Sequence, residues 1–152
     1  MTEFRKILFP VSLTKLSPII APYVASLAGK YGADIHLLHV TRQFDGYVDA
    51  YVKDTDDTEI KRVACDFEKE IVSGAEARLE RFKERHFKEY PSVKASVQTG
   101  AHYKMILKYV EKEGIDLVVM GTGRGVLSAM FGSVADKVAK LAPIPVMLIK
   151  KV

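Results

Sequence analysis

The chain has 152 residues and a formal net charge of +4, with 48% hydrophobic and 28% charged residues. These values are typical of one soluble globular domain, residues 1–152, that can bury a proper core. The positive charge is mild and no block of Lys and Arg with interleaved aromatics occurs, so nucleic acid is not an expected partner. No apolar run approaches the roughly 18 residues of a membrane span.

Cys65 is the single cysteine. An intrachain disulfide and an all-cysteine metal site are therefore excluded. A lone cysteine fits a reducing compartment, so we expect a cytoplasmic protein.

The first third of the chain predicts two strands around one helix. Residues 5–11 are expected to form a buried strand. Ser17 and Pro18 are typical of an N-cap and a first helical turn, and Gly32 is expected to end that helix. Pro22 predicts either a kink or a late helix start, because it removes a backbone donor. Residues 33–40 predict a second strand, on which His36 and His39 lie on opposite faces and cannot share a metal.

The middle of the chain predicts an irregular segment and a long helix. Residues 41–58 follow no regular pattern, and they form either a solvated loop or a lid whose aromatic side chains pack on a base. A helix is expected from Glu59 to about Phe87. Its apolar stripe is interpreted as core and consists of Ile60, Val63, Phe67, Ile71, Ala75, Leu79 and Phe82.

The last third continues the alternation. We expect an edge strand at 93–99, a helix at 102–113 closed by Gly114, a buried strand at 117–120, a helix at 133–141 and a strand at 143–150. This order predicts an α/β fold with a three-layer, open and mostly parallel five-stranded sheet. Ligands bind such sheets at the carboxyl ends of strands where the strand order reverses. Strands one and four, which end near Ser12 and Gly121, would make that crevice.

Three glycines follow the fourth strand, at Gly121, Gly123 and Gly125. Gly132 and Ser133 then open a helix whose N-cap pattern is completed by Asp136. A strand, a glycine-rich loop and a helix N-terminus can seat a phosphate on free N–H groups. The alternative is a plain turn followed by a helix cap. The segment is not a P-loop, because no Gly-Lys-Ser/Thr follows.

This stretch, VVMGTGRGVLSAMFGSVADKV, resembles the C-terminal signature of universal stress proteins. KILFPVS, GADIHLLHV and GSVADKVAKLAPIPVMLIK resemble other parts of that family, so the resemblance covers the whole chain. It implies an adenine nucleotide alpha hydrolase-like fold with strand order 3-2-1-4-5. It also implies a homodimer that pairs through the last strand, around Val146–Ile149.

The resemblance further implies ATP or AMP as ligand, with Mg²⁺ possible beside ATP. The main chain at Val40 would meet the adenine. The remaining nucleotide-binding positions carried over from the family are Pro10, Val11, Ser12, Met120, Gly121, Gly123, Arg124, Gly125, Gly132, Ser133 and Val134. The implied function is a dimeric regulatory protein of the stress response.

One residue and one spacing depart from the nucleotide-binding pattern. Ser12 stands where such members carry an aspartate, and eight residues rather than nine separate Gly123 from Gly132. The alternative hypothesis is therefore a family member that binds no nucleotide and acts through an unidentified protein partner. A third hypothesis is that the protein is an enzyme. The sequence shows no Ser-His-Asp set, no carboxylate pair and no metal-ligand spacing that would support it, so at most slow ATP hydrolysis is expected.

Overall fold

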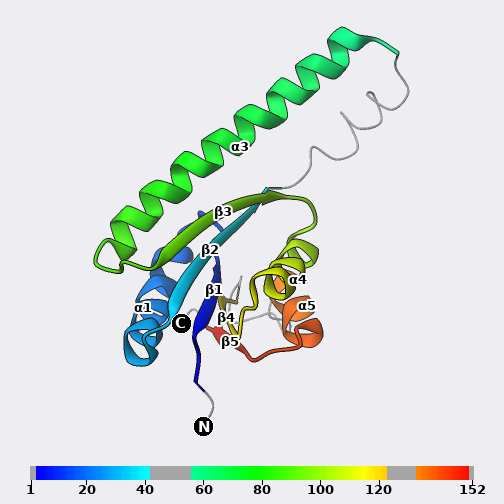
Figure 1. Ribbon diagram of the computed structural model, residues 1–152. Coiled ribbons are helices and arrows are strands. Elements are labelled where there is room, and N and C mark those ends of the chain that lie inside the picture. The colour runs from blue at the N-terminus through cyan, green and yellow to red at the C-terminus, as the bar shows by residue number, and fades with distance from the viewer. Residues whose placement is uncertain (1–2, 42–55, 123–132, 151–152) are drawn as a thin grey trace.

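The computed structural model describes residues 3–41, 56–122 and 133–150 (Figure 1). Five strands form one sheet in the order β3-β2-β1-β4-β5, and every neighbouring pair is parallel. Their bounds are β1 Lys6–Pro10, β2 Asp34–Thr41, β3 Val93–Thr99, β4 Leu117–Gly121 and β5 Val146–Ile149. The predicted fold class and strand order are confirmed.

Helices cover both faces of the sheet (Figure 1). The helices α1 Ser17–Tyr31 and α3 Thr58–Phe87 pack on one face, and α4 His102–Glu113 and α5 Ser133–Leu141 pack on the other. Alternate strand residues supply the two cores, because successive side chains of a strand point to opposite faces. On β1, Ile7 and Phe9 join the first core and Leu8 joins the second.

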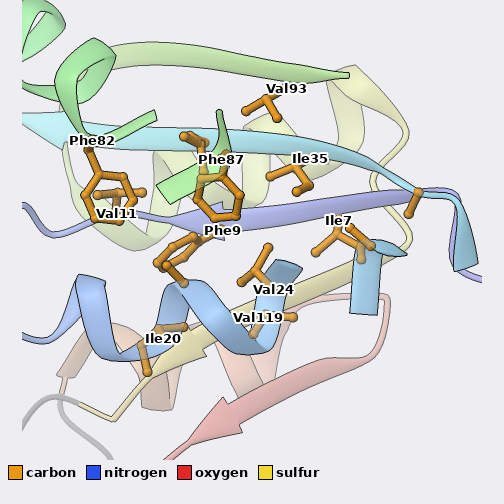
Figure 2. Close-up of a cluster of buried hydrophobic side chains, with 14 of the residues drawn as sticks. Ile7, Phe9, Val11, Ile20, Val24, Ile35, Phe82, Phe87, Val93 and Val119 are labelled. Atoms are coloured by element: carbon orange, nitrogen blue, oxygen red, sulfur yellow. The ribbon is translucent and has the colours of Figure 1, made fainter. Parts of the chain in front are cut away.

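The first core is built around aromatic contacts between β1 and α3 (Figure 2). The ring of Phe9 lies 6.0 Å from that of Phe82 and 6.4 Å from that of Phe87, edge to face in both cases. This geometry suits the charge distribution of aromatic rings. The C-terminal half of α3 is thereby fixed over the middle of the sheet.

The ends of the helices follow the predicted glycines, with one correction at α1. Gly32 and Gly114 take left-handed conformations, with φ of 62° and 65°, and close α1 and α4. Ser17, however, is not the N-cap of α1. The cap is Leu16, which makes no side-chain capping bond, and the helix begins at Ser17 without the late start considered for Pro22.

The apolar stripe of α3 was expected to be core, and that expectation is wrong for its first half. Ala75, Leu79 and Phe82 are buried, but Ile60, Val63 and Phe67 are 38%, 64% and 45% exposed. Figure 1 shows the N-terminal half of α3 extending well beyond the sheet. The described sheet offers no surface on which those residues could be buried.

Candidate functional site

The carboxyl ends of β1 and β4 lie side by side, because these two strands are paired in the middle of the sheet. The chain leaves β1 toward β2 on one side and returns from β3 to β4 on the other. The strand order therefore reverses between β1 and β4, which is where open α/β sheets bind ligands. We call this region the carboxyl edge, comprising residues 10–12, 39–41 and 120–122.

The strand β2 runs past the end of β1 at this edge. Pro10 is the last residue of β1 paired with β2, opposite Leu38, whereas β2 continues to Thr41. The carbonyl of Thr41 accepts a bond from the N–H of Gly100, so Thr41 faces β3. Successive residues of a strand face alternate neighbours. The main-chain groups of Val40 therefore face the side of β1, beyond its last paired residue.

Three of the predicted site residues can offer only their main chain to a ligand. Val11, Val40 and Met120 are 3%, 5% and 6% exposed, because their side chains belong to the two cores. At Val11 the main chain is also engaged. Its N–H donates to the carbonyl of Leu38 at 2.8 Å, and its carbonyl accepts from His39 Nδ1 at 2.7 Å.

Hydroxyl groups gather just after β1. Ser12 Oγ lies 2.7 Å from Thr14 Oγ1 and 3.0 Å from Ser17 Oγ, and Ser17 Oγ also accepts from the Ser12 N–H at 3.0 Å. This bond explains why Ser17 does not cap α1, since its hydroxyl is turned back toward Ser12. Sequence reasoning considered Ser12 alone and missed this cluster, although the spacing Ser12, Thr14, Ser17 could have suggested it.

Gly121 is required for close packing between β4 and the start of α1. A Cβ built on Gly121 would lie 2.7 Å from Leu16 Cδ2 and 3.1 Å from Ile20 Cδ1. Real Cβ atoms do not come this close to their neighbours, so the start of α1 rests directly on the end of β4. Pro10, the last residue of β1, is half-buried.

The remaining predicted site residues lie mostly outside the described residues. Gly123, Arg124, Gly125 and Gly132 belong to that group. Ser133 is the first residue of α5, and Val134 packs partly buried against the second core. Because β5 is parallel to β4, α5 must run back across the sheet from the carboxyl edge. Its N-terminus therefore points to the same edge as Val40.

The other charged and titratable candidates lie elsewhere. Asp116 sits at the opposite edge of the sheet, where its carboxylate accepts from the N–H groups of Arg5 and Lys6 at 2.9 and 3.2 Å. His36 is buried on β2, and it shares a 2.7 Å hydrogen bond with the hydroxyl of Tyr109. Burial lowers the pKa of His36 and raises the pKa of Tyr109 to about 12.

Over residues 3–41, 56–122 and 133–150, no group of three or more His, Cys, Asp and Glu side chains is placed to hold a metal ion. No helix in this part of the chain is long and apolar enough to cross a membrane. The carboxyl edge and the described segments next to it therefore provide main-chain groups, hydroxyls and the N-terminus of α5. These groups suit the binding of a polar, anionic small molecule.

The family model of the universal stress protein family matches residues 3–150. The universal stress protein MJ0577 of Methanocaldococcus jannaschii is 22% identical over 161 residues, which cover 97% of this chain and 96% of that protein. Its solved structure has a TM-score of 0.79 and covers 99% of both chains. The resemblance noted in the sequence is thus confirmed, and at this identity the structural likeness concerns the fold.

Two further solved structures of similar fold contain an adenine nucleotide. A universal stress protein in complex with cAMP has a TM-score of 0.67 and 14% identity, covering 98% of each chain. A family protein from Arabidopsis thaliana with AMP bound has a TM-score of 0.62 and 19% identity, covering 97% of this chain and 92% of its own.

Proposed function

We propose, from the premise that this chain belongs to the universal stress protein family, that it binds an adenine nucleotide at the carboxyl edge. ATP and AMP are the proposed ligands, and the bound nucleotide would set a surface through which the protein regulates a partner. The observation that carries the proposal is the position of Val40, whose main chain faces the space beyond the end of β1.

The chemistry of adenine supports this position. One edge of the base carries an amino donor beside a ring-nitrogen acceptor, and a peptide unit offers the complementary carbonyl and N–H. The side chain of Val40 is buried and holds the strand in place. A base at this point would be recognised through the main chain, which requires no particular side chain.

The phosphates are proposed to lie toward the N-terminus of α5. Free N–H groups and the positive end of the helix dipole favour an anion there. Gly123, Arg124, Gly125 and Gly132 are proposed to complete this part of the site, with Mg²⁺ beside ATP. The cAMP and AMP complexes of two proteins of similar fold support an adenine nucleotide as the ligand class.

One observation favours the alternative, a protein that binds no nucleotide. The hydroxyl of Ser12 is already held by Thr14 and Ser17, at 2.7 and 3.0 Å. A serine also supplies no charge where nucleotide-binding members carry an aspartate. In this alternative the protein acts through contacts with another protein, and the glycine loop is only a turn.

We also propose a homodimer formed through β5, the edge strand opposite β3. Met147 on this strand is 37% exposed, and an unpaired edge strand with apolar side chains is prone to pair with another chain. Light scattering of the purified protein would measure its mass. The variant Met147→Lys is expected to weaken the dimer, and a wild-type monomer at micromolar concentration would contradict this proposal.

The test of nucleotide binding begins with an absorbance spectrum. The chain has no Trp and 7 Tyr, so a copurified adenine would raise the 260/280 ratio visibly. Calorimetric titration with AMP, and with ATP with and without Mg²⁺, would then measure affinity. The double variant Gly132→Ala/Ser133→Ala is expected to bind at least tenfold more weakly, whereas the exposed control Ser73→Ala should not differ.

The proposal fails if the spectrum is that of protein alone and neither nucleotide produces heat or a thermal shift. It also fails if the double variant and the control bind equally well. Following ADP release during the titration would show whether ATP is hydrolysed.

A further inference from the structure

Three arginines line one face of the C-terminal half of α3. Arg78, Arg81 and Arg85 are separated by three and four residues, so their side chains are neighbours on the helix surface. Like charges at this spacing repel one another. In the described part of the chain the ion pairs are Lys83 with Glu80 and Lys140 with Asp136, and none involves these arginines.

The arginines open onto a pocket between α3 and the segment that joins β1 to α1. Its volume is about 320 Å³, and Leu13 and Thr14 form the opposite wall. Arg78 Nη2 donates to the carbonyl of Leu13 at 3.3 Å, which ties α3 to this segment. No Asp or Glu is among the lining residues, so the described walls carry positive charge and no negative charge.

His86 also lines this pocket. Burial, and after it the charge of Arg85, lower the pKa of its imidazole. Arg85 therefore places positive charge beside the imidazole of His86. A bound anion would neutralise it.

We propose that this pocket, lined by Thr14, Arg78, Arg81, Arg85 and His86, binds a phosphate group. Guanidinium groups present parallel N–H donors that match two oxygens of a phosphate. The hydroxyl of Thr14 supplies a further donor. The group is either free inorganic phosphate or the phosphate of a metabolite, because both present the same oxygens to the arginines.

The pocket lies on the α1 and α3 side of the sheet, whereas α5, where the nucleotide phosphates are proposed to bind, lies on the other. Among the described residues, the two sites approach each other at the segment after β1, where Thr14 Oγ1 contacts Ser12 Oγ at 2.7 Å. The arginine pocket is therefore an additional site, and it does not depend on the proposed nucleotide site.

The test is a calorimetric titration of the full chain with inorganic phosphate at low ionic strength. The triple variant Arg78→Gln/Arg81→Gln/Arg85→Gln is expected to bind at least tenfold more weakly. The control Lys61→Gln/Arg62→Gln/Lys69→Gln removes the same charge from exposed positions of the same helix. It should change phosphate affinity less than twofold.

Further variants and a spectroscopic measurement test the proposal if the triple variant folds poorly. Arg81→Gln alone should weaken binding severalfold, and the charge-retaining variant Arg78→Lys/Arg81→Lys/Arg85→Lys should also weaken it, because lysine lacks the paired donors. In an NMR spectrum of the wild type, the signals of the His86 ring should shift when phosphate is added. A His86 signal that stays unmoved at saturating phosphate would overturn the proposal.

Competition between phosphate and AMP distinguishes the two sources. Displacement of phosphate by AMP in the Gly132→Ala/Ser133→Ala variant would assign the pocket to the phosphate of a metabolite. Phosphate binding unaffected by AMP would assign it to the free ion. The proposal is wrong if the wild type binds neither inorganic phosphate nor AMP at this pocket. It is also wrong if the Arg78→Gln/Arg81→Gln/Arg85→Gln variant and the Lys61→Gln/Arg62→Gln/Lys69→Gln control lose phosphate affinity equally. Nucleotide binding that persists in the arginine variants would leave the proposed function intact.

Discussion

The two halves of α3 carry one apolar repeat but lie in different surroundings. In the C-terminal half, Leu79 and Phe82 are 1% and 9% exposed against the sheet. In the N-terminal half, Ile60 and Val63 are 38% and 64% exposed. The same spacing of apolar residues therefore leads to burial in one half and to exposure in the other.

Length explains this difference. A helix of 30 residues is about 45 Å long at 1.5 Å per residue. The edge strand beneath it, β3, has 7 residues and spans about 23 Å. About half of α3 can therefore pack on the sheet, and Figure 1 shows the other half projecting beyond it. Periodicity predicts which face of a helix is apolar, but only the partner surface decides how much of that face is buried.

The largest effect is expected from paired truncations in the two halves. Leu79→Ala should lower the free energy of unfolding by about 2–5 kcal/mol, because it leaves a cavity in the core. Val63→Ala should change it by less than about 0.5 kcal/mol, as exposed positions usually do. Urea unfolding of both variants measures these values. Equal losses would mean that Val63 is buried in solution, and the comparison would fail.

Hydrogen exchange should divide α3 at the same place. Amides of residues 62–73 lack a packed core beneath them, so they should open locally and exchange at least tenfold faster than those of residues 79–87. A tenfold ratio corresponds to about 1.4 kcal/mol. Mass spectrometry of peptides from the two halves provides the measurement. Uniform protection along the helix would show that a partner, or another part of the chain, covers the first half.

Gly74 lies at the junction of the two halves and offers a gain of stability. A Cβ at this position would meet no atom within 4 Å. Gly74→Ala should therefore raise the free energy of unfolding by about 0.5–1 kcal/mol, because alanine favours the helix and restricts the unfolded chain. Thermal unfolding measures the change. A matched replacement, Gly121→Ala, should destabilise the protein instead, since its Cβ would collide with Leu16.

The smallest expected effect is a pH dependence of stability that arises from the sheet and the C-terminal half of α3, and not from the projecting N-terminal half. Burial lowers the pKa values of His36 and His86, and residues 58–74 contain no histidine. With a folded pKa below 6.5, each group stabilises the fold above that pH and loses this contribution as the pH falls through its folded pKa.

Unfolding midpoints compared at about pH 7.5 and pH 5.5 would measure this dependence. We expect His86→Gln to reduce the difference between the two midpoints, whereas Val63→Ala should leave it unchanged. A wild-type midpoint that does not fall over this interval would contradict the expectation for both histidines.

The alternation of strands and helices, the glycines that end α1 and α4, and membership of the family could all be predicted from the sequence. The strands, the helices and the helix ends depend on neighbours within one or two turns of chain, so short patterns are enough to specify them. The position of the carboxyl edge followed as well, because parallel strands with helical crossovers leave few topologies open.

Contacts between distant segments were decided only by the tertiary structure. It brought Leu16 over Gly121, turned Ser17 toward Ser12 and set β2 past the end of β1, so that the main chain of Val40 faces the side of β1 beyond its last paired residue. It also placed Arg78, Arg81 and Arg85 opposite Thr14. These contacts depend on strand register and on the relative lengths of helix and sheet, which join residues far apart in the chain. No local pattern of side chains encodes them.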